Sequence, residues 1–257
     1  MSRFGEMRRV IGVLVAIAAV TVAAAGCSSD DDSSSTTILN VYAAASLKQT
    51  FTAIEKAFEQ QHPDVDVKPS FAGSSALVNQ INQGADADVI ATADEATMTK
   101  LGDKVNTPQI FARNTLTIVT APGNPKGVES FASLTNPGIK TVVCAVEVPC
   151  GAATAQVERD SGIDITPVSE ESSVTAVLTK VTSGEADAGL VYVTDAKAAG
   201  AKVTAVGDPA FTNVVNNYPI ATLKASTHQQ LAEEFVQLVL GDTGQKVLTD
   251  AGFAPPV

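Results

Sequence analysis

Two serines at the ends of predicted strands are the residues whose chemistry stands out first. A strand-like run at 39–42 passes through three alanines to Ser46, and the segment 71–75 repeats this plan with Gly73 and then Ser74. A helix that begins there presents unpaired N–H groups and about +0.5 charge, so it could hold an anion without lysine or arginine. The alternative is that each serine only caps its own helix, Ser46 in a capping box with Gln49.

Three further segments place hydrogen-bond donors at predicted element ends. A proline and a glycine flank Cys150 at a predicted helix start, which leaves the Cys150 amide free to donate. The amide of Val174 follows a serine pair (172–173) at another helix start, where plain capping is the alternative. Tyr192 lies near the end of a predicted strand, and its phenol could donate to an oxyanion, although a lone strand tyrosine is more often a packing residue.

Strand-like and helix-like runs alternate along the chain. Apolar β-branched runs predict strands, and apolar residues spaced three and four apart predict helices. The alternation predicts an α/β fold whose mostly parallel sheet is covered by helices and binds ligands at the carboxyl ends of its strands. The expected elements are strand 39–42, helix 47–61, strand 65–71, helix 75–83, strand 89–91, helix 95–101, strand 114–120, helix 128–134, strand 140–144, helix 151–161, strand 166–168, helix 174–183, strands 188–193, 203–206 and 216–223, and helices 227–240 and 243–251.

Two extended crossings predict two lobes. The run 114–120 ends at a loop rich in proline and glycine, 121–125, and the run 216–223 returns the chain for its final helices. We therefore expect lobe 1 to contain 38–117 and 217–257, and lobe 2 to contain 118–216. Two such crossings act as hinge strands, and the ligand cleft lies between the lobes.

The first residues predict export. Three arginines precede an apolar run at 10–25, which is typical of a signal peptide at 1–26. The residues 24–26 before Cys27 resemble a bacterial lipoprotein signal, so Cys27 is expected to be lipidated, and the polar segment 27–37 is expected to be a flexible tether. A retained transmembrane anchor is the alternative, but the apolar run is short for a span. The expected location is the outer side of the cytoplasmic membrane.

Charge and cysteine content narrow the partners. The chain has a formal net charge of −11, which argues against nucleic acid and against electrostatic attraction to anionic lipids. A lipid anchor is then the expected membrane contact. In an oxidising compartment Cys144 and Cys150 are expected to form a disulfide; two buried thiols or a metal site are the alternatives.

The ordered set of segments 43–47, 71–75, 148–151 and 189–192, with 80–88 between them, resembles the periplasmic molybdate-binding proteins of ABC transporters. That resemblance covers 39–253 and implies a type II periplasmic-binding-protein fold that grips a tetrahedral dianion. It places the family's serine ligands on Ser46 and Ser74, its tyrosine ligand on Tyr192, and its amide donors on Cys150 and Val174. It further implies molybdate and tungstate as ligands, an ABC transporter permease as partner, a monomer, no cofactor and no direct cation ligand.

Other functions were weighed against this one. Sulfate or another tetrahedral oxyanion is the nearest alternative, followed by an organic carboxylate held by Lys48 or Arg113. A serine hydrolase would need a base near Ser46 or Ser74, and the two histidines, His62 and His228, lie in a predicted loop and at a helix start. We therefore expect a binding protein and not an enzyme. A donor-only site should also reject hydrogen phosphate, whose proton needs an acceptor.

Overall fold

The computed structural model describes residues 36–256. The predicted signal peptide, Cys27 and the tether up to residue 35 lie outside the described residues. The predicted tether ends inside the first strand, which begins at Thr37.

Strands and helices alternate through most of the described chain. The strands are β1 (Thr37–Ala44), β2 (Val65–Ala72), β3 (Val89–Ala91), β4 (Gln109–Thr120), β5 (Thr141–Cys144), β6 (Ser169–Glu171), β7 (Ala188–Tyr192), β8 (Thr204–Val206) and β9 (Val215–Thr222). The α-helices are α1 (Lys48–Gln61), α2 (Ser74–Asn82), α3 (Glu95–Thr99), α4 (Pro149–Ser161), α5 (Val174–Thr182), α6 (Val193–Ala199), α7 (Gln229–Leu240) and α8 (Asp242–Ala251).

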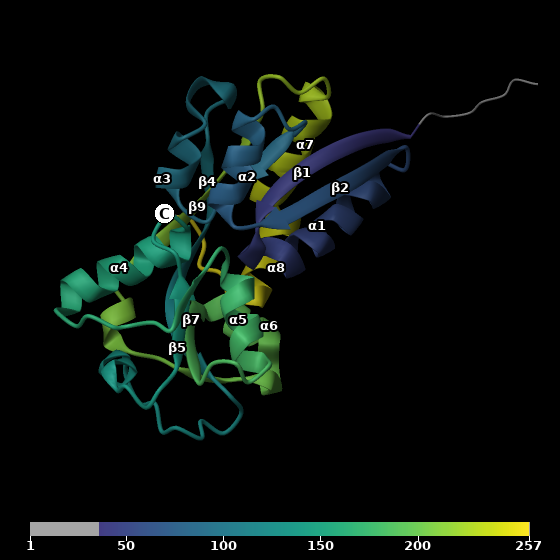
Figure 1. Ribbon diagram of the computed structural model, residues 1–257. Coiled ribbons are helices and arrows are strands. Elements are labelled where there is room, and N and C mark those ends of the chain that lie inside the picture. The colour runs from purple at the N-terminus through teal and green to yellow at the C-terminus, as the bar shows by residue number, and fades with distance from the viewer. Residues whose placement is uncertain (1–35, 257) are drawn as a thin grey trace, which may run out of the picture. The chain divides into compact units, whose positions relative to one another are not determined.

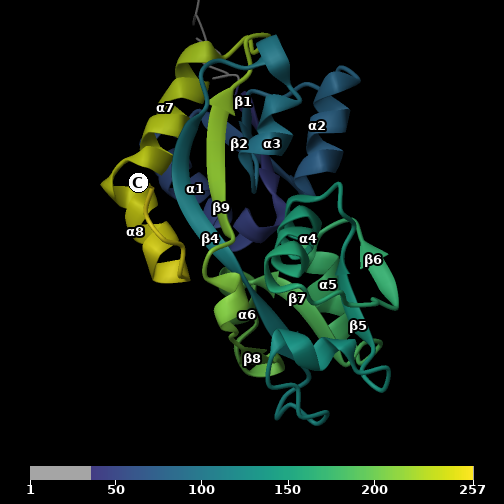
Figure 2. The ribbon, with the colours of Figure 1, turned by 90° about the vertical axis from the view of Figure 1, so that its left-hand side faces the viewer.

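Strand β4 joins two halves of the sheet. The strand order is β2-β1-β3-β9-β4-β7-β5-β6, and β8 pairs with β4. The first part of β4, Gln109–Thr115, pairs with β9, whereas Leu116–Thr120 pairs with β7. Figure 2 shows β4 continuing from the half that contains α2 and α3 into the half that contains β5 and β7.

Helices cover both faces of the first half of the sheet. On one face, α1, α7 and α8 pack together around Phe51, Phe58, Phe111 and Phe235, whose rings contact one another in tilted and edge-on pairs (Figure 1). On the other face, α2 and α3 bury a second apolar cluster that includes Leu77. In the second half, α5 packs directly on β7, because Gly189 leaves room for the side chains of α5.

The predicted α/β class and its two-lobed arrangement are confirmed, but the sheet is less parallel than expected. Both crossing strands, β4 and β9, pair antiparallel with each other, and β9 also pairs antiparallel with β3. A chain that crosses between two halves and then returns must run in opposite directions in its two crossings.

Three local expectations were wrong. The segment 128–134 forms only a short 3-10 helix at Phe131–Thr135, and the strand expected at 166–168 lies at Ser169–Glu171. The strand expected to reach residue 193 ends at Tyr192, where α6 begins directly.

Among residues 36–256, no helix has the length and apolar character needed to cross a membrane.

Candidate functional site

All five residues singled out in the sequence line one small cavity between the two halves of the sheet. Ser46 and Ser74 come from the first half, and Cys150, Val174 and Tyr192 come from the second. The rest of the lining consists of alanine, glycine, valine and proline, so no charged side chain contributes to it. The cavity is small, with a volume of about 10 Å³.

Three helix starts meet at this cavity. Ser74 is the first residue of α2, Val174 is the first residue of α5, and Cys150 is the second residue of α4. Within the described part of the chain, the amides of Ser74, Cys150 and Val174 make no hydrogen bond. Three positive helix ends and their free N–H groups therefore face the same small volume, which is suited to an anion.

The hydroxyl of Ser46 does not cap a helix, so the predicted capping box with Gln49 is wrong. The chain makes a 3-10 turn at Ala45–Leu47 before α1, and that turn has no side-chain cap. The Oγ atom of Ser46 lies 3.0 Å from the hydroxyl oxygen of Tyr218, a fully buried residue of β9. Ser46 is thus held beside the cavity by a partner from a distant part of the sequence.

The hydroxyl oxygen of Ser74 already accepts one hydrogen bond from the backbone. The backbone N–H of Ala93 donates to Ser74 Oγ at 3.0 Å, and Ser74 is 1% exposed. The N-cap of α2 is Gly73 and not Ser74, and α2 has no side-chain cap, so the plain capping role considered for Ser74 is not present. The hydrogen of this hydroxyl is left to donate elsewhere.

The phenol of Tyr192 is buried and neutral. Burial raises the pKa of Tyr192 well above its ordinary value, and the nearby Tyr218 phenol raises this pKa further. The side-chain amide of Asn216 donates to the Tyr192 hydroxyl oxygen at 3.1 Å. Tyr192 therefore remains a protonated donor across the physiological pH range.

The start of α4 is held against the end of β5. The sulfur atoms of Cys144 and Cys150 are bonded in a disulfide, with the two Cα atoms 5.7 Å apart. The next residue must be glycine, because a Cβ atom at Gly151 would lie 1.9 Å from the carbonyl oxygen of Ala145. These contacts fix the direction of the Cys150 amide.

At the start of α5, Ser173 is a simple cap, since its Oγ accepts from the Ala176 amide at 3.2 Å.

The two halves touch beside the cavity. A Cβ atom at Gly73 would lie 2.1 Å from the carbonyl oxygen of Ser172, so the backbones of α2 and α5 approach as closely as glycine allows. The hydroxyl of Ser75 donates to the carbonyl oxygen of Glu147. Both contacts join the first half to the second, which makes this a closed conformation.

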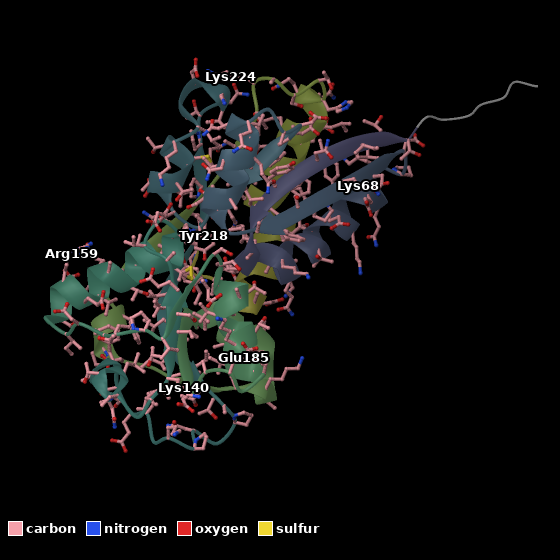
Figure 3. All side chains as sticks on the ribbon, in the orientation of Figure 1. Lys68, Lys140, Arg159, Glu185, Tyr218 and Lys224 are labelled. Carbon is pink, nitrogen blue, oxygen red and sulfur yellow. A yellow bond between two sulfur atoms is a disulfide. The ribbon has the colours of Figure 1, made fainter. Side chains whose placement is uncertain are left out.

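Basic and histidine side chains lie away from the cavity. Lys48 is exposed, and Arg113 uses its Nε to donate to the carbonyl oxygen of Pro255 at 2.8 Å. His62 and His228 are not among the residues that line the cavity, so neither histidine is placed to act as a base for Ser46 or Ser74 there. In Figure 3, Tyr218 lies at the junction of the two halves, whereas Lys68, Lys224 and Arg159 lie at the periphery.

A larger groove borders the same serine. It has a volume of about 610 Å³, and its lining includes Ser46, Lys48, Asp195 and Lys202. Burial raises the pKa of Asp195 to about 7, against the opposing effect of the Tyr192 N–H that it accepts at 3.0 Å. We assign the site to the smaller cavity because only there do all five predicted donors meet. In residues 36–256 no group of three or more His, Cys, Asp or Glu could hold a metal ion.

Sequence reasoning missed the residues behind the lining. Tyr218 and Asn216 support Ser46 and Tyr192, and the backbone of Ala93 supports Ser74. The available signal was the polar pair Asn216-Asn217 directly before Tyr218 in an otherwise apolar crossing strand. Polar side chains on a central buried strand need partners, so their presence indicates a network.

Known proteins resemble this chain over most of its length. Residues 39–254 match the family model described as bacterial extracellular solute-binding protein. A molybdate-binding protein, ModA, from Mycobacterium tuberculosis is 51% identical over 84% of each chain. Among solved structures, the periplasmic molybdate-binding protein of Azotobacter vinelandii has a TM-score of 0.73 at 22% identity, covering 85% of this chain and all of its own.

A sulfate-binding protein shares the fold equally well. SubI from Mycobacterium tuberculosis has a TM-score of 0.76 at 22% identity, over 85% of this chain and 87% of its own. The structural likenesses therefore establish the fold, and the sequence matches establish the relationship predicted from the motifs. These relatives are solute-binding proteins and not enzymes, as expected from the sequence. The chain belongs to the bacterial extracellular solute-binding protein family.

Proposed function

We propose that this protein binds molybdate in the cavity between its two lobes and delivers it to the permease of an ABC transporter. The observation that supports this most strongly is the lining: three hydroxyls and three free helix-start amides converge, and no charged side chain is among them. Such a set compensates a dianion by hydrogen bonds and helix dipoles alone. The identity to molybdate-binding proteins supports the choice of anion.

The proposed ligands are the hydroxyls of Ser46, Ser74 and Tyr192 and the amides of Cys150 and Val174. A tetrahedral oxyanion is larger than one water molecule, so a cavity of about 10 Å³ must widen to admit it. We place the hinge at β4 and β9, with lobe 1 formed by 38–117 and 217–257 and lobe 2 by 118–216. Tungstate has the charge and shape of molybdate and should bind at the same place.

The cellular setting is part of the same proposal. The sequence before the first strand resembles that of an exported lipoprotein, so Cys27 would anchor a monomeric protein to the outer side of the cytoplasmic membrane. Residues 27–35 would give the binding domain reach to the permease.

Sulfate is the second candidate, because a sulfate-binding protein shares the fold and sulfate also lacks a proton. Calorimetric titration of the purified protein with molybdate, tungstate, sulfate and phosphate separates the candidates. We expect one molybdate or tungstate per chain, weaker sulfate binding and no heat from phosphate. Stronger binding of sulfate than of molybdate would assign the protein to sulfate, and no binding of any of the four anions would refute an oxyanion site.

A further inference from the structure

We infer that Asn216 is a specificity-determining residue that fixes Tyr192 as a donor and thereby excludes protonated tetrahedral anions from the cavity. This inference rests on the proposed function, since it concerns the same site. Asn216 does not line the cavity. It lies on β9 at the crossing between the halves, paired with Asn114 of β4, and it is buried.

The orientation of the Asn216 amide is determined by its surroundings. Its Nδ2 lies 2.9 Å from the carbonyl oxygen of Ala93 and 3.1 Å from the hydroxyl oxygen of Tyr192. A carbonyl oxygen can only accept, so the atom facing Ala93 must be the NH₂ group and not the amide oxygen. The second hydrogen of that NH₂ group then points at Tyr192, whose oxygen must accept it. The hydrogen of the Tyr192 hydroxyl then points away from Asn216, where the Tyr218 phenol and a ligand in the cavity are its available acceptors.

The backbone of Ala93 also orients a second hydroxyl, that of Ser74, as a donor. The Ala93 N–H donates to Ser74 Oγ at 3.0 Å, and a backbone amide cannot reverse its direction. One residue of the first lobe therefore sets both donors, Ser74 directly and Tyr192 through Asn216. Hydroxyls are ordinarily free to donate or accept, but here two of the three already accept a hydrogen bond from a fixed N–H group, which directs their own hydrogen away from that group.

The third hydroxyl is adjustable only at a cost. Ser46 could accept a proton from a ligand by turning its own hydrogen onto Tyr218, but the Tyr218 hydrogen would then lose the Ser46 oxygen as its acceptor. Nearby carbonyl oxygens are also occupied: Gly73 accepts from the Ala76 amide and Val148 from the Ala152 amide, both at 2.9 Å. A protonated anion would therefore place its own hydrogen against the hydroxyl hydrogens of Ser74 and Tyr192. Two donors facing each other in a buried site make no hydrogen bond, which disfavours binding of that anion.

Replacing Asn216 by aspartate should turn the Tyr192 hydroxyl around, so that it donates to residue 216 instead of accepting from it. An ionised aspartate can only accept, and a protonated one would donate to the Ala93 carbonyl and accept with its other oxygen. In both forms the Tyr192 hydrogen turns toward residue 216, and a lone pair faces the cavity. The matched control is Asn217→Asp, the same change one residue along, where the side chain points away toward Glu95 at 2.8 Å.

The test is calorimetry with molybdate, sulfate and phosphate at about pH 8, where inorganic phosphate is mostly a dianion with one proton. All three ligands then have the same charge, so repulsion by the new aspartate should weaken their binding equally and leave the ratios between their affinities unchanged. We expect Asn216→Asp to lower the ratio of molybdate to phosphate affinity by about tenfold or more, with the ratio of molybdate to sulfate affinity kept within about threefold. Asn217→Asp should leave both ratios unchanged.

A double-mutant cycle checks the assigned route. In a Tyr192→Phe background, Asn216→Asp should no longer change the ratio of molybdate to phosphate affinity, because no hydroxyl remains to be reversed. If the aspartate variant does not fold, Asn216→Leu removes the same donor without charge and should lower the same ratio. An unchanged ratio in a folded Asn216 variant that still binds molybdate would overturn the inference alone. If the wild-type protein bound no anion, the proposed function would be wrong and the inference with it.

Discussion

At the scale of single residues, the candidate site presents neutral hydrogen-bond donors instead of lysine or arginine side chains. Ser46, Ser74 and Tyr192 are held by hydrogen bonds from β9 and from the Ala93 backbone. Burial keeps the phenol of Tyr192 protonated by raising its pKa. A charged ligand can therefore be compensated without a permanent positive charge that would itself need to be desolvated.

Removing one hydroxyl should weaken molybdate binding measurably. We expect Ser46→Ala, Ser74→Ala and Tyr192→Phe each to cost about 1 to 3 kcal/mol of binding free energy, because each deletes a hydrogen bond to a charged group. Calorimetry on the three variants gives the values, with Ser183→Ala at the exposed end of α5 as the control. Wild-type affinity in all three variants would eliminate the proposed ligand set.

Asp195 should make the protein less stable as the pH rises. Its pKa is about 7 in the folded protein against an ordinary value of 3.8, so the folded state retains a proton that the unfolded state releases. The free energy of unfolding should then fall between about pH 4 and pH 7, and each pKa unit corresponds to about 1.4 kcal/mol. The sign follows because the unfolded state binds fewer protons in that interval.

The variant Asp195→Asn keeps an acceptor for the Tyr192 amide and cannot ionise. Urea unfolding at about pH 5 and pH 8 should show a smaller loss of stability in this variant than in the wild type. The exposed change Asp160→Asn serves as the control. An equal loss of stability in wild type and Asp195→Asn would show that Asp195 does not titrate in this range.

At the scale of elements, helix α4 is the one whose position relies on a covalent bond. The disulfide joins its second residue, Cys150, to the end of β5 at Cys144. Closing so short a loop stabilises the folded state by about 2 kcal/mol on the chain-entropy model. It also holds the Cys150 amide in the cavity wall.

Replacing both cysteines by serine should therefore have two effects. The Cys144→Ser, Cys150→Ser protein should lose about 2 kcal/mol of unfolding free energy and bind molybdate more weakly, although the residue 150 amide itself is retained. Denaturant unfolding and calorimetry measure the two effects separately. A loss of stability with full affinity would mean that the bond supports the fold but not the site. In the unfolded, non-reduced wild type, thiol labelling should find no free Cys144 or Cys150.

The sequence predicted the elements better than their pairing. Periodicity located α1, α2, α5 and α7 to within two or three residues, because each buries one apolar face. It could not predict that β4 and β9 pair antiparallel, since pairing depends on where the chain crosses between lobes. It missed α6, because this helix follows β7 without an intervening turn signal.

In the candidate site, the lining residues could be predicted from the sequence, but their hydrogen-bond partners could not. Small residues pointed to Ser46 and Ser74, a flanking proline and glycine to Cys150, and a preceding serine pair to Val174. The structure brings these four residues to one cavity. The partners of those residues were not visible, because Tyr218 and Ala93 are distant in the sequence from the serines they support. Local patterns identify where free amides and hydroxyls can occur, whereas hydrogen-bond direction requires the tertiary structure.

At the scale of the whole described domain, the proposed binding would be coupled to closure of the two lobes. The closed form brings the Gly73 backbone against Ser172 and joins Ser75 to Glu147, so both lobes contribute to one lining. A ligand that contacts both lobes stabilises the closed form by its extra affinity for that form.

A methyl group at the contact between the lobes should oppose closure. In Gly73→Ala the new Cβ atom would lie 2.1 Å from the Ser172 carbonyl oxygen, although the φ of −57° at this position suits alanine. We expect molybdate affinity to fall by about tenfold or more with little change in the melting temperature of the ligand-free protein. Gly207→Ala, where no atom lies within 4 Å, is the control. Unchanged affinity in Gly73→Ala would show that the site does not require this contact.

The most direct test of the central claim is an experimental structure of the protein with molybdate bound. The account predicts one anion between the lobes, with its oxygens accepting from the hydroxyls of Ser46, Ser74 and Tyr192 and from the amides of Cys150 and Val174. An anion bound elsewhere, or one held by lysine or arginine side chains, would contradict it.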